Sequence, residues 1–216
     1  MNRLSTIAAI CVVSATVVIT LLTRSAADAP SVRDILDRVG AASAATPNMT
    51  ADVVFKLWKR RPSGDQAPDC EFTGTMAVQD GRPVVRVSRG GTSLFCTALN
   101  HYVVGRMFNG SEPLASFLDR FDFTIVGDKQ VGTDAYYQIQ GPARDPKGNP
   151  HAMSAWVDYM TGLVTQGTLD YNWGTVDVDQ QYVQLNNTPV LVGQSVRTSK
   201  YAAMLQIVYS NFHFSP

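Results

Sequence analysis

Side chains able to carry acid–base or nucleophilic chemistry are few in this sequence and widely spaced. The three histidines, His101, His151 and His213, form no H-x-x-H or H-E pair of the kind that binds a metal. Ser195 follows Gly193-Gln194 but does not complete the G-x-S-x-G turn of serine hydrolases. We therefore predict that the protein is not an enzyme, and that it has neither catalytic residues nor a cofactor.

Two carboxylates, Asp177 and Asp179, are separated by one residue in an alternating segment, so both point to one face of a strand. Such a pair could ligate Ca²⁺, but a solvated strand face carries this pattern far more often, and we predict no metal site. The cationic run Lys59-Arg60-Arg61 is interpreted either as a solvated strand end or as a contact for anionic lipid head groups.

Three cysteines are present, of which Cys11 lies in an apolar N-terminal stretch and Cys70 and Cys96 lie in the body of the chain. In an oxidising compartment the last two can pair. The bridge would close a loop of about 27 residues and contribute on the order of 3–4 kcal/mol in the chain-entropy model. We predict this disulfide; the alternative is two unpaired buried thiols.

The N-terminus indicates export. Arg3 is followed by the uncharged run Leu4–Leu22 and then by small residues ending at Ala29. This order is typical of a secretory signal peptide, although the apolar run is also just long enough to span a bilayer. We predict that residues 1–29 are either a cleaved signal or an N-terminal membrane anchor. Both place residues 30–216 in the periplasm or on the outer face of the cytoplasmic membrane.

Length and charge limit the remaining possibilities. The chain has 216 residues, which indicates one domain, here predicted to span residues 30–216. Eighteen basic and eighteen acidic residues give a formal net charge of zero. Nothing in that balance favours a polyanion, so nucleic acid is excluded as a partner.

The body of the chain is predicted to open with one helix and to continue as strands. Ser31-x-x-Asp34 resembles a capping box, apolar residues follow at helical spacing up to Val39, and Gly40 and Thr46-Pro47-Asn48 mark the end. Beyond this point apolar and polar residues alternate in about a dozen short segments separated by turn residues. This pattern predicts an antiparallel meander that is closed or half-closed on itself.

Two segments depart from the alternation. Residues 111–121 have apolar residues at helical spacing and predict an inserted helix. The last segment, Ala202–Phe214, is apolar on both faces and therefore needs a cover, for which the two helices are the candidates. We predict a mainly β protein with a few helices (α+β): a strongly curved antiparallel sheet forming a half-barrel, with an N-terminal helix and an inserted lid helix.

The chain resembles the superfamily of outer-membrane lipoprotein-sorting carriers, the LolA/LolB-like proteins. The residues that carry the resemblance span almost the whole body of the chain: Asp34-Ile-Leu36-Asp-Arg-Val39, Thr50–Phe55, Val126-Gly-x-x-x-Val131-Gly132-x-Asp134-Ala-Tyr136, Trp156-Val-Asp158-x-x-x-Gly162-Leu163 and Leu205–Phe214. The resemblance implies an eleven-stranded half-barrel with a helical lid, holding acyl chains or another apolar ligand in its concavity.

We accordingly predict a binding or carrier protein for a lipid or lipoprotein acyl chain. Its partners would be the lipid or acylated lipoprotein and an envelope membrane protein; the alternative is a non-enzymatic envelope sensor or interaction module with the same fold. Seven residues on the apolar faces of alternating segments are predicted to line the cavity: Phe55, Leu57, Val85, Val87, Leu169, Tyr171 and Trp173. Four residues of the inserted helix are predicted to form the lid: Leu114, Phe117, Leu118 and Phe121.

Overall fold

The computed structural model describes residues 29–79, 82–91, 93, 96–97, 104, 113–200 and 202–215. Met1–Ser31 and Val32–Pro216 form separate compact units, and the fold described here is that of the second. The predicted signal or anchor segment lies outside the described residues except for its last position, and so does His101. No helix within the described ranges has the length and hydropathy needed to cross a membrane.

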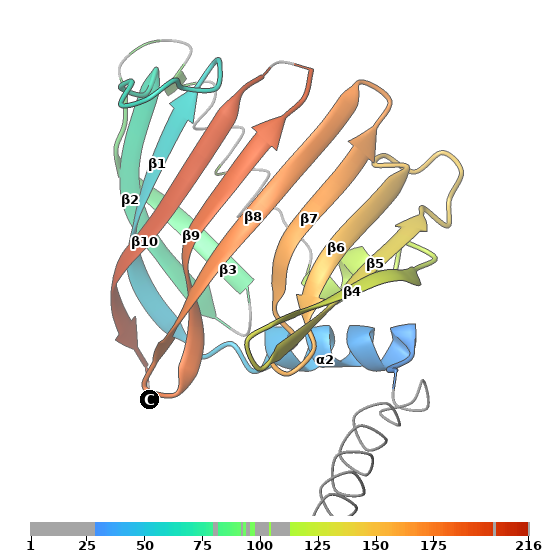
Figure 1. Ribbon diagram of the computed structural model, residues 1–216. Helices are drawn as coiled ribbons and strands as arrows, with labels where there is room; N and C mark the ends of the chain where they lie inside the picture. The colour runs from blue at the N-terminus through green and yellow to red at the C-terminus, as the bar shows by residue number, and fades with distance from the viewer. Residues whose placement is uncertain are drawn as a thin grey trace, which may run out of the picture. The chain divides into compact units, whose positions relative to one another are not determined.

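Ten antiparallel strands form one sheet in the order β3-β2-β1-β10-β9-β8-β7-β6-β5-β4 (Figure 1). The strands are β1 (Met49–Trp58), β2 (Cys70–Gln79), β3 (Arg82–Arg89), β4 (Thr124–Val131), β5 (Asp134–Pro142), β6 (Ala152–Asp158), β7 (Val164–Tyr171), β8 (Gly174–Leu185), β9 (Thr188–Thr198) and β10 (Met204–Phe214). The first and last strands pair with each other, whereas β3 and β4 are the outermost of the described strands. The predicted meander is confirmed, with ten strands in the described part of the chain where the resemblance implied eleven.

The sheet curls about its strands without closing, so one of its faces is concave (Figure 1). Helix α2 (Val32–Ala44) crosses one end of the sheet and contacts the short helix α4 (Leu114–Leu118). The predicted fold class, a curved half-barrel with few helices, is therefore confirmed. Helix α2 continues past Gly40, where the sequence suggested its end, and stops before Thr46. A β-carbon added at Gly40 would meet no atom within 4 Å, so no close packing requires a glycine in mid-helix there, and its cost is that of its low helix propensity.

A first hydrophobic cluster covers the concave face of β1, β2, β3, β9 and β10. Alternation along β1 buries every second residue, and the register places Phe55 opposite Phe72 on β2 and Ile207 on β10. The Phe55 and Phe72 rings stack with centroids 4.7 Å apart. The buried members of this cluster include Val53, Phe55, Leu57, Cys70, Phe72, Met76, Val85, Val196, Leu205, Ile207 and Tyr209.

A second hydrophobic cluster joins the two helices to β5, β6 and β7. Ile35 and Val39 of α2 are fully buried against it, as the helical spacing of these residues predicts. Its other buried members are Leu118, Phe121, Phe123, Ile139, Met153, Ala155, Val157 and Val164. Among the described residues, the two helices thus pack on the β5–β7 end of the concave face.

The expectation that β10 is covered on both faces is wrong. Leu205, Ile207 and Tyr209 are buried in the first cluster, but Val208 on the opposite face is 37% exposed. Helix packing on the second cluster leaves this outer face of β10 to solvent. Single apolar side chains on a protein surface are common. On β10 such exposed residues gave the sequence the appearance of a strand that is buried on both faces.

The predicted disulfide is confirmed. Cys70 begins β2 and bridges Cys96, with Cα atoms 5.6 Å apart. Both cysteines are buried in the first cluster. The bridge therefore fixes the segment after β3 to the concave side of the sheet.

Candidate functional site

A cavity of about 670 Å³ lies between α2 and the concave face of the sheet. Two strands of the first cluster, β1 and β2, contribute Met49, Met76 and Val78 to its wall, and α2 contributes Val39 and Ala42. Its remaining lining residues are Ser43, Ala45, Thr46, Pro83, Leu114, Thr161, Gly162, Leu163, Val164, Gln180, Tyr182, Gln184, Asn187, Thr188, Pro189, Val190, Leu191, Gln194 and Tyr209. We call this space the concave cavity.

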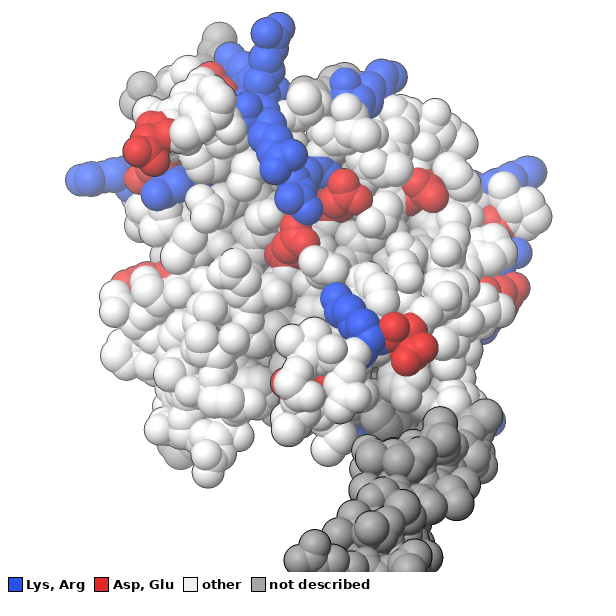
Figure 2. Space-filling view, in the orientation of Figure 1, with Lys and Arg blue, Asp and Glu red and all other residues white. Residues whose placement is uncertain are grey.

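No described residue that lines the concave cavity carries a formal charge. The same end of the molecule is uncharged on the surface shown in Figure 2, where the lower left of the view lies over the β8–β9 turn and the end of β10. Lysine, arginine and carboxylate side chains lie instead toward the top, the centre and the right of that view. A ligand that enters the concave cavity thus meets apolar groups and neutral polar groups.

Two tyrosines supply polar atoms in the wall. The Tyr182 hydroxyl donates a hydrogen bond to Oε1 of Gln180 over 2.9 Å. Burial raises the pKa of Tyr182 to about 12; burial, with the nearby Tyr182 adding to it, also raises the pKa of Tyr209. Both phenols therefore remain neutral hydrogen-bond donors over the physiological pH range.

None of the seven predicted cavity residues is among the described residues that line the concave cavity. Phe55, Leu57 and Val85 are buried in the first cluster and Val87 packs against it. None of the four is among the residues that line the concave cavity. Their predicted contact with a ligand stays a prediction; their observed role is packing.

The other three predicted cavity residues lie on β7 and the turn that follows it. Leu169 packs against the second cluster. Tyr171 and Trp173 stack on each other with ring centroids 5.1 Å apart at the β7–β8 turn. None of the three is among the lining residues either. The sequence analysis also missed the polar lining residues Gln180 and Tyr182, although they continue the face of Val176 and Val178 on β8.

Of the four predicted lid residues, one lines the concave cavity and three pack in or against the second cluster. Leu114, at the start of α4, lines the concave cavity and is 38% exposed. Leu118 and Phe121 are buried in the second cluster, and Phe117 packs against it and against Phe121 with centroids 5.5 Å apart. Phe121 lies beyond the helix in an isolated bridge to Ala143. The lid role of these four residues remains a prediction. The position of Leu114 in the cavity lining agrees with it better than the positions of the other three.

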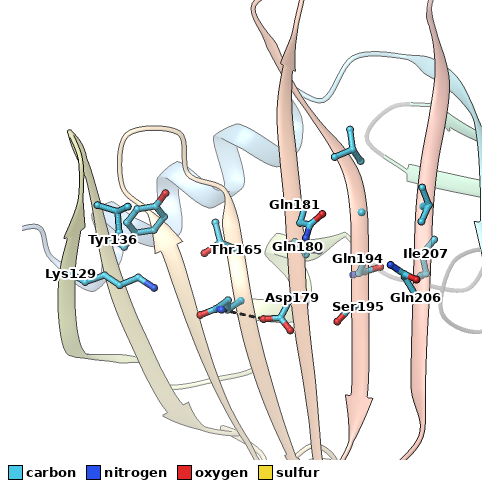
Figure 3. A pocket seen from close by; sticks show the side chains of 15 residues that line it. Lys129, Tyr136, Thr165, Asp179, Gln180, Gln181, Gln194, Ser195, Gln206 and Ile207 are labelled. Carbon is cyan, nitrogen blue, oxygen red and sulfur yellow. Dashed lines mark hydrogen bonds between the residues drawn. The ribbon is translucent and has the colours of Figure 1, made fainter. Parts of the chain in front are cut away.

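A second hollow of about 570 Å³, the outer groove, lies on the opposite face of the sheet (Figure 3). Cross-strand pairing places Asp179, Ser195 and Gln206 side by side on this face, and Lys129 and Tyr136 border it on β4 and β5. The Lys129 ammonium lies 4.2 Å from the centre of the Trp156 ring. Ser195 therefore lies on an open polar surface, with no histidine among the described lining residues.

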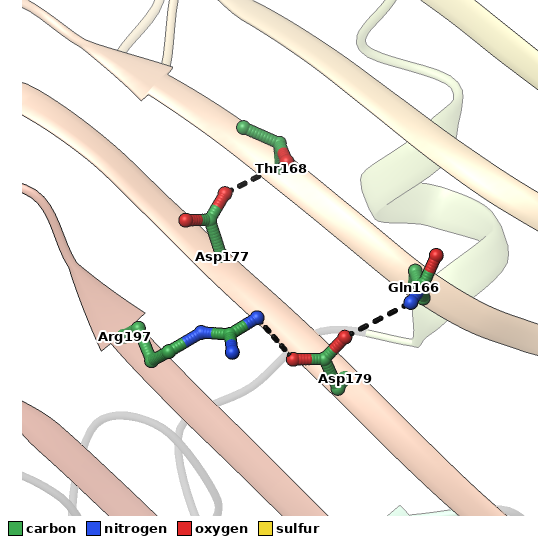
Figure 4. A network of polar contacts seen from close by, with 5 residues as sticks. All are labelled: Gln166, Thr168, Asp177, Asp179 and Arg197. Carbon is green, nitrogen blue, oxygen red and sulfur yellow. Dashed lines mark hydrogen bonds and ion pairs between the residues drawn. The ribbon is translucent and has the colours of Figure 1, made fainter.

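The carboxylates considered as a calcium pair are held by protein groups (Figure 4). Asp179 forms an ion pair with Arg197 and accepts a hydrogen bond from Nε2 of Gln166 over 3.1 Å. Asp177 accepts a hydrogen bond from the Thr168 hydroxyl over 2.9 Å. Within the described ranges, no three His, Cys, Asp or Glu side chains cluster as metal ligands would.

The concave cavity is the stronger candidate for a ligand site. In the outer groove, the charged group Asp179 is already held by Arg197 and Gln166. The concave cavity instead presents apolar surface, which is poorly hydrated and gains most from an apolar occupant. Its volume lies within the range of about 300–1,000 Å³ that small-molecule sites usually have.

Neither a family model nor a curated protein matches the sequence. Among solved structures, a DUF1329 family protein from Desulfovibrio piger aligns with a TM-score of 0.57 at 12% identity, over 87% of this chain and 94% of that one. A LolA superfamily protein from Nitrosomonas europaea aligns with a TM-score of 0.52 at 11% identity, over 87% and 95%. A domain assigned as an outer membrane lipoprotein-sorting protein from Vibrio parahaemolyticus gives 0.58 at 10%, over 84% and 91%. The chain therefore has the LolA-like fold that its sequence motifs implied.

Proposed function

We propose that the protein binds the acyl chain of a lipid or of an acylated lipoprotein in the concave cavity and carries it through the cell envelope. The observation that carries this proposal is the cavity itself, a space of about 670 Å³ with no charged residue in its described lining. Burying a methylene group is worth about 0.8 kcal/mol, so an acyl chain can be held without a charged partner.

The proposed location is the periplasm or the outer face of the cytoplasmic membrane. The order of basic, apolar and small residues at the N-terminus supports export. The Cys70–Cys96 disulfide supports an oxidising compartment, because such bonds are rare in the cytosol. An envelope location also brings the protein to its proposed partners, a lipid or acylated lipoprotein and an envelope membrane protein that delivers or receives it.

Ligand entry is proposed to involve α4. Leu114 lies in the lining and is partly exposed, so it stands where the cavity meets solvent. The rest of the α4 segment is anchored through Leu118 and Phe121 in the second cluster. Displacement of the first turn of α4 would widen the opening while leaving that anchor in place.

Native mass spectrometry of the protein purified from bacterial membranes and periplasm would test the proposal by detecting co-purified acyl lipids. A fluorescent fatty-acyl probe would then measure binding to Leu114→Asp and to the control Val126→Asp. Both side chains are exposed enough to tolerate a carboxylate, but only Leu114 lines the concave cavity. We expect Leu114→Asp to weaken probe binding about tenfold or more, because a charge beside an acyl chain must be desolvated.

The outcomes separate the two functions that the sequence suggested. Probe binding that is unchanged in Leu114→Asp, or reduced equally in Val126→Asp, would contradict an acyl site in this cavity. A folded wild-type protein that neither co-purifies with an acyl lipid nor binds the probe would favour the envelope sensor or interaction module.

A further inference from the structure

The sheet wall of the concave cavity carries a polar group of four residues among apolar neighbours. Gln180 and Tyr182 come from β8, Gln194 from β9 and Tyr209 from β10, and all four line the cavity. The register pairs Gln180 with Gln194, and Gln194 with the fully buried Ile207, so these side chains share the concave face. We call these four residues the polar wall.

Tyr209 is the most buried member of the polar wall, with 3% of its surface exposed. Among the described residues no hydrogen-bond partner of its hydroxyl is seen, and that hydroxyl is not one of the completely enclosed polar atoms, as expected for a group that opens on the cavity. The Tyr182 hydroxyl, by contrast, donates to Gln180. The side-chain carboxamide of Gln194 also lines the cavity and can donate to an occupant. A hydroxyl that opens on the cavity without a protein acceptor is free to donate to an occupant that offers one.

The described lining of the concave cavity favours an uncharged acceptor as the ligand group that meets the polar wall. The described lining contains no lysine, arginine or histidine to pair with an anion. A fatty-acid carboxylate beside Tyr209 would therefore be desolvated without a counter-charge, which is strongly unfavourable. An ester or amide carbonyl demands no counter-charge and accepts hydrogen bonds from a phenol and from a carboxamide.

We infer that Tyr209 and Gln194 donate hydrogen bonds to an ester or amide carbonyl of the ligand, so that the concave cavity selects linked acyl chains over free fatty-acid anions. This inference rests on the proposed acyl-binding function and adds the linkage that is recognised. Burial keeps Tyr209 protonated, because it raises the pKa of that phenol.

Displacement of a bound fluorescent acyl probe tests the inference with three competitors of equal chain length: a fatty-acid methyl ester, the free fatty acid at a pH where it is ionised, and the hydrocarbon. Wild-type protein should bind the ester about tenfold or more tightly than the anion. Tyr209→Phe and Gln194→Met should each weaken ester binding roughly three- to tenfold, the loss of one hydrogen bond, and leave hydrocarbon binding unchanged.

Tyr137→Phe is the matched control, because Tyr137 packs against the second cluster and is not a lining residue. This control should change none of the three affinities. Equal binding of anion and ester by the wild type, or an unchanged ester affinity in Tyr209→Phe, would overturn the inference while leaving acyl binding intact. A wild type that binds none of the competitors would instead overturn the proposed function.

Discussion

Gly162 lies so close to α2 that a β-carbon placed on it would be 2.4 Å from the carbonyl oxygen of Arg38. The β6–β7 turn reaches this position because Asp158 accepts hydrogen bonds from the backbone N–H groups of Met160 and Thr161. The Arg38 guanidinium lies 4.1 Å from the centre of the Tyr159 ring in the same contact. The motif Trp156–Leu163 is thus a docking turn for α2, which forms one wall of the concave cavity.

The Gly162→Ala variant should lower the free energy of unfolding by more than the cost of its backbone conformation alone. Its φ of +72° is one that L-residues rarely adopt and that costs on the order of 1–2 kcal/mol. The clash with Arg38 adds to that cost. Gly132→Ala is the control, since Gly132 has a φ of +63° but no atom within 4 Å of the added carbon. Equal losses in urea unfolding would show that contact with α2 does not matter.

The fold was largely predictable because its elements keep strict periods. Alternation along β1 and helical spacing in α2 both reflect one buried face, and the structure buries those faces. The burial of β10 was not predictable in the same way. Val208 is apolar without a cover, and a sequence pattern does not distinguish an exposed apolar residue from a buried one.

The cavity wall was harder to predict than the fold. Alternation selects the most apolar positions, such as Phe55 and Val85, and those positions fill the space around them. A cavity forms where packing is incomplete, and here Gln180 and Tyr182 interrupt an apolar face. The available signal was a polar residue continuing the Val176–Val178 face of a strand. That signal identifies which face of the strand is involved, but it does not show whether the space above that face is a cavity or is filled by side chains.

The disulfide should matter for stability. Replacing both Cys70 and Cys96 by alanine is expected to lower the free energy of unfolding by about 2–4 kcal/mol under oxidising conditions, because the unfolded chain is no longer cross-linked. Urea unfolding with and without a thiol reductant measures this effect. Reductant should destabilise the wild type and leave the double variant unchanged. A wild type that is insensitive to reduction would contradict the expectation.

The buried hydroxyl of Thr198 on β9 allows a test in which a substitution should not destabilise the protein. Oγ1 of Thr198 is buried without a hydrogen-bond partner, so Thr198→Val should be neutral or stabilising by up to about 1 kcal/mol. Thr168→Val is the matched control, because Oγ1 of Thr168 donates to Asp177 and its loss should cost about 0.5–1.5 kcal/mol. Both changes keep a β-branched side chain in a strand. Urea unfolding that shows equal costs for the two variants would refute the distinction.

Alkaline pH should destabilise the protein through the polar wall. The ordinary pKa of tyrosine is 10.0, and burial raises that of Tyr182 to about 12. Between these values the unfolded state releases the phenolic proton while the folded state keeps it, so the free energy of unfolding falls as pH rises. The stability that this group contributes is fully present below pH 10 and is lost progressively up to about pH 12, by up to about 3 kcal/mol for a shift of this size. Tyr209, whose pKa burial also raises, adds a loss of the same sign.

Urea unfolding at a series of pH values, with an ultraviolet titration of the phenols, should show this fall in the wild type. The Tyr182→Phe/Tyr209→Phe double variant should show a much shallower fall over the same range, and an equally steep one would place the titrating groups elsewhere.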